Sequence, residues 1–321
     1  MEPPIKLVEL FDMSLPEPEY LVDKLIPEGA ITIISGTSGS YKSYACLDMA
    51  IAIAEGKPAF GHFETKKTGV MYIDEENGLR LLKKRLEQLG ADRNLDIYFQ
   101  SYKGFVVNED NIDNLIWDCT TNNVGLVIFD SLVRVNQGDE NNARDMAAFF
   151  RLIKNLVYKD ISVVLIHHNR KPGSMNAGAG NEMRGSSDIH ASIDSHVGFK
   201  RAQQRITVTQ TKLRTSLEAS PFWLKVEGND ENVTLEYQGD LLDSHDTELD
   251  TEVLIVLRDG ELSQKDVLTA LKARDGVKVN EHNLRNLLKV MVAEGQLQVS
   301  SGAGNTKLYA IKHEGDGSES S

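Results

Sequence analysis

The stretch that decides the fold is Ile31–Ala50, "ITIISGTSGSYKSYACLDMA". It runs from a β-branched apolar segment through a turn rich in glycine and serine into a helical pattern. A phosphate-binding loop needs this order, because the amides of the turn and the helix N-terminus face the anion. Gly36, Lys42 and Ser43 fall in register with the pattern G-x-x-x-x-G-K-[ST]. Tyr41 stands where that pattern has its second glycine, so an ordinary turn before a helix remains the alternative.

Two further segments support a phosphate site. Residues 126–131, "LVIFDS", form an apolar strand pattern that ends in Asp130, where such sites carry a carboxylate for Mg²⁺. Residues 71–77, "MYIDEEN", end another strand pattern with three acids, one of which could deprotonate an attacking water. The same acids could instead cap the next helix, since carboxylates suit a helix N-terminus. These acids are Asp74, Glu75 and Glu76.

Strand and helix patterns alternate along the first half of the chain. Apolar strand patterns are expected at residues 30–35, 68–76, 96–101, 124–131 and 160–168, with helices at 77–90 and 143–159. This alternation predicts a parallel sheet with ligands at the carboxyl ends of its strands. Residues 204–214, 221–228 and 232–239 then predict antiparallel strands that close one edge.

Histidines follow the last parallel strand pattern. His167 and His168 are adjacent, so on a strand they point to opposite faces and do not share a metal ion. One of them is expected to face a γ-phosphate as a polar sensor. The segment 186–196, "SSDIHASIDSH", offers a metal-ligand set, but helix caps and solvated histidines explain it better. Its candidate ligands are Asp188, His190, Asp194 and His196.

The C-terminal part differs in texture. Three helical patterns between residues 250 and 295 precede a strand, a Gly-rich turn and a strand, which predicts a winged-helix domain. Nine Lys/Arg against eight Asp/Glu between residues 250 and 312 make only a weak basic footprint, so contact with protein is the alternative to DNA. The polar residues expected on the third helix and wing are Asn283, Arg285, Asn286, Lys289 and Lys307.

Composition limits the possible partners and compartment. The 321 residues carry a net charge of −13, which argues against nucleic-acid binding by bulk attraction and requires any basic surface to be local. Cys46 and Cys119 lack zinc spacing and are expected to be buried thiols in a reducing cytoplasm. The first residues are acidic and proline-bearing, and no apolar run reaches 18 residues, so no signal peptide or membrane segment is expected.

Taken in order, these motifs resemble a known family. The loop at 36–43, "YIDEEN", "LVIFDS", "LIHHNRK", "RGSS" (184–187) and "TKLR" (211–214) follow the order of RecA-like ATPases. They are most similar to the plasmid RepA-type hexameric replicative helicases and related phage proteins, over roughly residues 18–228. The resemblance implies an α/β fold, a RecA-like P-loop NTPase core with a mostly parallel central sheet, besides the C-terminal winged helix. The expected parts are an irregular N-terminal arm at 1–28, the ATPase domain at 29–240, an acidic linker at 241–249, the winged helix at 250–312 and a disordered tail at 313–321.

The resemblance also implies roles for single residues. ATP is the expected ligand with Mg²⁺, held by Ser43 and Asp130, while Lys42 contacts the β- and γ-phosphates. Glu76, rather than its neighbour Glu75, matches the general base, and His168 matches the γ-phosphate sensor. The residues that match the phosphate-binding loop are Gly36, Thr37, Ser38, Gly39, Ser40, Tyr41, Lys42 and Ser43.

Other roles would act between subunits of a ring. Lys212 and Arg214 resemble a K-x-R pair that reaches into the neighbouring site as an arginine finger, and on a strand the two share one face. Lys200 and Arg201 are a second candidate pair, and a solvated strand edge is the alternative for both. The Gly- and Asn-rich loop after His168 would face the central channel and touch single-stranded DNA, or else be an ordinary surface loop. The basic residues expected to bind DNA are Arg170 and Lys171 in this loop and Arg184 at the start of "RGSS".

The resemblance therefore implies a ring, expected to be a hexamer, that hydrolyses ATP and moves along single-stranded DNA in plasmid or phage replication. A replication initiator or a primase is a further expected partner. The alternatives are a recombination or helicase-loading ATPase, and an ATP-binding winged-helix regulator of DNA. Tyr41 is the departure: a left-handed backbone there costs on the order of 1 kcal/mol without glycine. Its ring could weaken nucleotide binding, or pack on the nucleotide or on a neighbouring subunit.

Overall fold

The computed structural model describes residues 4–13, 18–168, 187–241, 243–258, 260–274, 277, 279, 281–293, 296–302 and 306–312. The chain divides into two compact units, Met1–Gly239 and Asp240–Ser321, each with its own hydrophobic core. The candidate site lies in the first unit, so that unit is described first.

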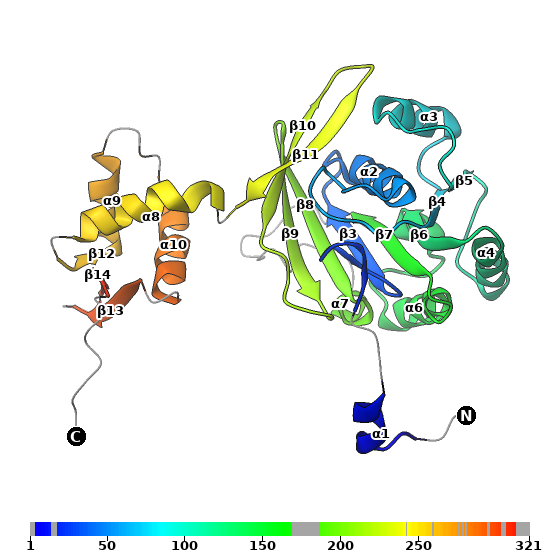
Figure 1. Cartoon of the computed structure of the whole chain (residues 1–321), viewed down its shortest axis with the longest axis horizontal. Coiled ribbons are helices and arrows are strands. Elements are labelled where there is room, and N and C mark those ends of the chain that lie inside the picture. The colour runs from blue at the N-terminus through cyan, green and yellow to red at the C-terminus, as the bar shows by residue number, and fades with distance from the viewer. Residues whose placement is uncertain are drawn as a thin grey trace. The chain divides into compact units, whose positions relative to one another are not determined.

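A nine-stranded sheet organises the first unit, in the order β11-β10-β9-β8-β3-β7-β6-β4-β5 (Figure 1). The six strands from β8 to β5 are parallel, which confirms the predicted α/β fold with a mostly parallel central sheet. Their bounds are β3 (Ile31–Gly36), β4 (Gly69–Asp74), β5 (Ile97–Ser101), β6 (Val124–Asp130), β7 (Ser162–His168) and β8 (Ser195–Ala202).

Antiparallel strands extend the sheet at one edge, as expected. β9 (Arg205–Leu213) pairs antiparallel with β8, and β10 (Phe222–Gly228) pairs antiparallel with β9. β11 (Val233–Asp240) is the outermost strand. β8 itself was not predicted, and it is the strand that joins the parallel sheet to this extension.

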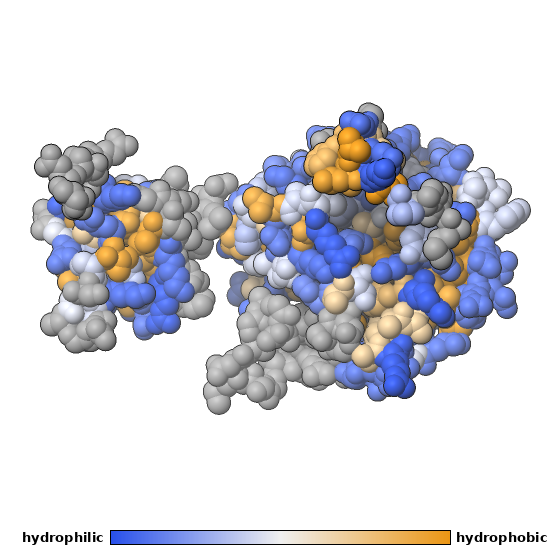
Figure 2. All heavy atoms as spheres, turned by 90° about the horizontal axis from the view of Figure 1, so that it is seen from below, coloured by the Kyte–Doolittle hydropathy of each residue, from blue (hydrophilic) through white to orange (hydrophobic). Residues whose placement is uncertain are grey.

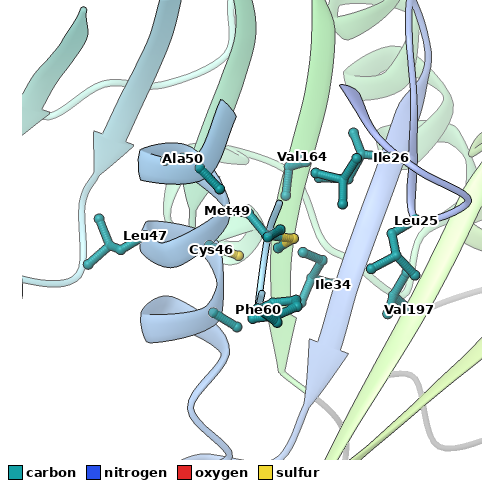
Figure 3. Close-up of a cluster of buried hydrophobic side chains, with 14 of the residues drawn as sticks. Leu25, Ile26, Ile34, Cys46, Leu47, Met49, Ala50, Phe60, Val164 and Val197 are labelled. Atoms are coloured by element: carbon teal, nitrogen blue, oxygen red, sulfur yellow. The ribbon is translucent and has the colours of Figure 1, made fainter. Parts of the chain in front are cut away.

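Helices cover both faces of the parallel sheet. α2 (Lys42–Glu55) and α3 (Leu79–Gln88) belong to one core, and Figure 3 shows Cys46 and Met49 of α2 facing Ile34 and Val164 of the sheet. α2 is buried over most of its length, as expected for a helix that is apolar all round. The other core is formed with the helices on the opposite face, which are α4 (Glu109–Thr121), α5 (Leu132–Val135), α6 (Ala143–Val157) and α7 (Ser187–Ser192).

The N-terminal segment is more ordered than predicted. Residues 1–28 were expected to be irregular, but α1 (Leu7–Asp12), β1 (Tyr20–Val22) and β2 (Ile26–Pro27) form within them. β1 and β2 pair with each other, and their apolar side chains pack into the core beside α2. α1 differs, since none of its residues is buried and Phe11 is 80% exposed. On the face that Figure 2 shows, which is the view of Figure 1 seen from below, most residues are hydrophilic and apolar patches lie among them.

The second unit has the element order helix, strand, helix, helix, strand, strand. Its core is formed by apolar residues of all three helices and of the sheet β12-β14-β13. The segment expected as a linker, 241–249, lies largely within the first helix, because Leu249, Val253 and Leu257 recur every four residues and pack into that core. The elements are α8 (Asp243–Leu257), β12 (Leu262–Ser263), α9 (Gln264–Lys272), α10 (Glu281–Ala293), β13 (Leu297–Ser301) and β14 (Lys307–Ile311).

Candidate nucleotide-binding site

The carboxyl ends of four parallel strands bring the predicted residues together. Gly36 at the end of β3 is level with His168 at the end of β7, and Asp74 at the end of β4 is level with Asp130 at the end of β6. The loop 36–43 runs from the end of β3 directly into α2. The sheet therefore presents the loop, two aspartates and a histidine at one edge, where open α/β sheets bind their ligands.

The loop has the backbone that a phosphate cradle requires. Tyr41 precedes α2 with φ 66° and ψ 18°, so this position is left-handed, as the glycine of the motif would allow. Gly36 is needed for a different reason, since a Cβ there would lie 2.4 Å from the backbone oxygen of Phe199 on β8. The N-terminus of a 14-residue helix thus opens onto the cleft, and its amides favour a bound anion.

Lys42 is buried inside this loop. Its Nζ donates to the carbonyl oxygens of Gly36 and Thr37, both at 2.8 Å, and lies 3.4 Å from Ser40 Oγ. Burial lowers the pKa of Lys42, while the negative charge of Asp130 acts in the opposite direction. The ammonium group is therefore held at the centre of the loop, where a nucleotide's phosphates would lie.

Asp130, the last residue of β6, lies next to the N-terminus of α2 and is almost fully buried. Its carboxylate accepts hydrogen bonds from the hydroxyls of Ser43 and Tyr72, the latter at 3.0 Å. Burial, with the nearby charge of Asp74, raises the pKa of Asp130 to about 6. A hydroxyl and a carboxylate oxygen in contact, with excess negative charge around them, are the hard ligands that suit Mg²⁺. Ser43 and Asp130 fit the role expected of them.

The three acids after β4 have separate tasks. Glu75 accepts hydrogen bonds from the backbone amides of Lys103, Gly104 and Phe105, at 3.0, 3.1 and 2.9 Å, and so it secures the turn after β5. Asp74 accepts the backbone amide of Glu76 at 2.8 Å and that of the following residue at 2.6 Å, which shapes the turn into α3. Glu76 alone extends into the cleft.

Glu76 and His168 form a pair across the site. His168 Nε2 lies 3.3 Å from Glu76 Oε2, and about a third of each side chain is exposed. The hydrogen bond with His168 lowers the pKa of Glu76, against the effect of burial. Glu76 is therefore ionised at neutral pH and able to accept a proton. The neighbouring His167 is buried, as expected for the opposite strand face.

Arg201 on β8 reaches back over its own loop. Its guanidinium carbon lies 4.5 Å from the ring centroid of Tyr41, and Nη1 donates to the carbonyl of Gly39 at 3.3 Å. Tyr41 also packs on the ring of Tyr44, with centroids 5.4 Å apart. The aromatic ring that breaks the loop motif thus holds a cation from the same chain. The pairing of Lys200 and Arg201 as a finger for a neighbouring site does not fit this position.

The cleft contains one cation that the sequence analysis missed. It has a volume of about 290 Å³, close to the lower limit of ligand pockets. Arg85 lines it from α3, three residues after the buried Leu82. A cation at that spacing, on the buried side of a helix that follows an acidic turn, is the signal that could have identified it. The lining residues are Ser38, Gly39, Ser40, Tyr41, Lys42, Ser43, Tyr44, Glu76, Asn77, Arg85, His168 and Arg201.

Lys212 and Arg214 lie at the other end of the sheet. Lys212 is paired with His196 near the start of β8, whereas the loop begins at Gly36, which is level with Phe199 further along β8. The Nζ atom of Lys212 donates to the carbonyl of His190. Arg214 donates to Asp194 Oδ1 at 3.0 Å and to the carbonyl of Ala191 at 2.6 Å. Both cations bind carbonyl oxygens near the end of α7 and do not approach the loop of their own chain.

Two residues of the histidine- and aspartate-bearing segment, Asp194 and His196, stabilise the fold. Asp194 accepts the amide of Ile31 at 2.9 Å and so ties β8 to β3. His196 was expected to be solvated but is buried, with Nε2 2.8 Å from Ser35 Oγ and Nδ1 against the hydroxyl of Thr211. Burial lowers the pKa of His196 to about 4. In the part of the chain that the structure describes, no three His, Cys, Asp or Glu residues are placed to hold a metal ion.

The residues predicted to touch DNA, Arg170, Lys171 and Arg184, lie outside the described residues, as does the side chain of Asp188. Among the described helices, none combines the length and apolar character needed to cross a membrane. Both cysteines, Cys46 and Cys119, are buried free thiols.

Comparison with known protein families gives a match. A family model described as AAA domain matches residues 2–174, more than half of the chain, and covers β3, β4, β6 and β7, the four strands whose ends carry the loop, Asp74, Asp130 and His168. No curated protein matches the chain.

Proposed function

The chain belongs to the AAA domain family, and from this premise we propose that it is an ATPase that hydrolyses ATP in the cleft at residues 36–43. Nucleotide binding, typically with Mg²⁺, is what membership of this family implies. The observation that carries the proposal is the convergence of three features at one sheet edge: Lys42 within the loop, the contact of Ser43 with Asp130, and the pair of Glu76 with His168.

Each residue has a separate task in this proposal. Lys42 and the amides of α2 bind the phosphates, and Ser43 with Asp130 would hold Mg²⁺, which neutralises charge on the phosphates. Glu76 orients the attacking water and accepts its proton, because it is the ionised acid in the cleft. His168 positions Glu76 and responds to the terminal phosphate through the same ring.

The test is steady-state ATP hydrolysis by the full chain. Lys42→Ala is expected to abolish it, and Glu76→Gln to lower it about 10²- to 10⁴-fold, the usual effect of losing a general base. Glu75→Gln and the exposed Glu87→Gln are matched controls, since neither carboxylate extends into the cleft. Hydrolysis that is unchanged in Lys42→Ala would rule out this site.

We further propose that the ATPase is a ring-forming helicase or translocase, of the kind that replicates plasmids or phages. The support is the motif order shared with the RepA-type helicases, together with basic residues in the segment between β7 and α7. Single-stranded DNA is expected to stimulate hydrolysis, and a forked duplex to be unwound only when ATP is present. Stimulation without unwinding would favour a recombination or helicase-loading ATPase instead.

For the second unit we propose a winged-helix domain. Its element order, with a small antiparallel sheet after the third helix, supports that fold. Arg285 on α10 is in an ion pair with Glu281 at 3.2 Å, so the basic character of this helix is partly neutralised. Deletion of residues 240–321 is expected to leave ATP hydrolysis intact, and filter binding of duplex DNA by the two forms would decide whether this unit contacts DNA.

A further inference from the structure

Arg85 is a cation in the cleft to which the proposed chemistry gives no role. It projects from α3 into the same cleft as Lys42 and Glu76. Its Nε and Nη1 atoms are buried, and neither has a hydrogen-bond partner among the described residues. A buried donor without a partner is costly, and a charged one more so. The position therefore favours a ligand that accepts hydrogen bonds.

The surroundings of Arg85 hold it in place. Its guanidinium carbon lies 5.2 Å from the ring centroid of Tyr44, a cation–π contact. The Tyr44 hydroxyl donates to Gln88 Oε1 at 2.7 Å, and Gln88 Nε2 donates to the carbonyl of Asp230 at 3.1 Å. Arg85 and Gln88 are three residues apart on one helix, so the same helix supplies the cation and fixes the ring beneath it. The cation is thus positioned before any ligand arrives.

No carboxylate in the described chain neutralises Arg85 by direct contact. None lies within ion-pair distance of it in the part of the chain that the structure describes. Asp74 acts on it only through space, and both oxygens of that carboxylate already accept hydrogen bonds from Asn77. Glu76 instead contacts His168. Among the described residues, the positive charge of the guanidinium is therefore not compensated by a direct ion pair. The ligand that matches this charge in the cleft is an anion.

We propose that Arg85 binds a phosphate oxygen of the nucleotide from the same subunit, as a second cation beside Lys42. The inference rests on the proposed nucleotide site and adds a residue to it. Arginine suits phosphate because its N–H donors are fixed in a plane and its charge is permanent. The rival role is structural, in which Arg85 only orders Tyr44 and contributes nothing to the ligand.

The test compares the affinities of ATP, ADP, AMP and adenosine by titration calorimetry, in a Glu76→Gln background that slows hydrolysis. Arg85→Gln is expected to weaken ATP binding about 10- to 100-fold, the range for a hydrogen bond to a charged group, and to leave adenosine binding unchanged. Arg85→Lys is expected to recover part of the loss because it keeps the charge. Arg80→Gln is the matched control, since Arg80 is exposed on the same helix.

The ligand series separates the two roles. The shortest ligand that shows the loss identifies the phosphate that Arg85 contacts. Equal weakening of ATP and adenosine, or no weakening of ATP, would overturn the inference. The ratio of the two affinities within one variant does not depend on the folded fraction, so a partly unfolded variant still gives an answer. A chain that binds no ATP with Arg85 present would instead contradict the proposed function.

Discussion

Tyr41 departs from the residue type of the loop motif but keeps the left-handed backbone that the motif requires. The motif alone predicts a left-handed backbone at this position, and the structure has it, with φ 66°. A non-glycine residue in this conformation costs about 1–2 kcal/mol. What the sequence could not show is the partner, because Arg201 lies 160 residues further along the chain and stacks on the ring. Arg201 is exposed and Tyr41 is half-buried, and a cation–π contact of this kind contributes about 0.5–1 kcal/mol, enough to offset part of that strain.

Two substitutions separate strain from stacking at Tyr41. Tyr41→Gly removes both the strain and the ring, so the free energy of unfolding is expected to change by less than about 1 kcal/mol. Tyr41→Ala keeps the strain and loses the ring, and is expected to destabilise the chain by about 1–2 kcal/mol. Urea denaturation measures both, with Gln203→Gly as a control that relieves an exposed left-handed residue. ATP hydrolysis by Tyr41→Gly should stay intact or rise; complete loss would show that the ring has a direct catalytic task.

His196 makes stability depend on pH. It is buried between Ser35 and Thr211, with His167 and His190 as the titratable groups nearby, and burial lowers its pKa to about 4 in the folded chain. The unfolded chain binds a proton near pH 6.5, so stability is present above that pH and is lost as the pH falls toward 4. The loss is at most about 3 kcal/mol. His196→Gln is expected to flatten the decline in urea midpoint between pH 6.5 and 4.5, and an unchanged slope would assign the decline to other groups.

At the scale of elements, the sequence predicts what local patterns encode. The buried strands β3, β4, β6 and β7 are continuous apolar runs, so their positions follow from burial on both faces. β8 has no such run, since "SHVGFKRA" mixes polar residues and a glycine. Its place between β3 and β9 depends on pairing with distant residues, such as the hydrogen bond from the Ile31 amide to the Asp194 carboxylate, which local patterns do not contain.

The pairing of β3 with β8 can be tested at Gly36, where the two strands approach each other closely. A Cβ on Gly36 would lie 2.4 Å from the backbone oxygen of Phe199, which a side-chain rotation cannot relieve. Gly36→Ala is therefore expected to lower the free energy of unfolding by about 1–3 kcal/mol and to weaken ATP binding, because the loop must shift. Gly198→Ala on β8 is the matched control: its Cβ would meet Thr209 O at an ordinary 3.5 Å. Equal stability of the two variants would show that the strands separate more easily than this register implies.

For the whole molecule, net charge is a poor guide to the site. The chain carries −13, yet Lys42, Arg85 and Arg201 gather around one cleft. The motif spacing predicts Lys42. Arg85 and Arg201 lie on α3 and β8, two segments that no motif in the sequence connects to the loop. Lys212 and Arg214 are the reverse case. Their spacing suggests a site, and the sheet places them at the end away from their own loop.

This separation makes the neighbouring-subunit role of Arg214 testable by mixing. In the proposed ring, each active site takes its loop and Glu76 from one subunit and its arginine from the next, a head-to-tail interface. Arg214→Ala and Glu76→Gln subunits should each be nearly inactive alone. Mixed in equal amounts, they leave about a quarter of interfaces with both groups intact, so up to about a quarter of the activity should return.

The control for mixing is a pair of lesions on the same side of the interface. When Glu76→Gln and Lys42→Ala subunits are mixed, every subunit carries a lesion on the side of the interface that supplies the loop and Glu76. No site in any ring is then complete, so no activity should return. The chain's own contacts of Arg214, with Asp194 and with the carbonyl of Ala191, supply the competing explanation that the side chain only secures α7. A structural role of that kind damages the subunit that carries the lesion, and mixing then gives no more than the sum of the two inactive proteins. Recovery above that sum, absent from the control pair, therefore requires that Arg214 act on the neighbouring site.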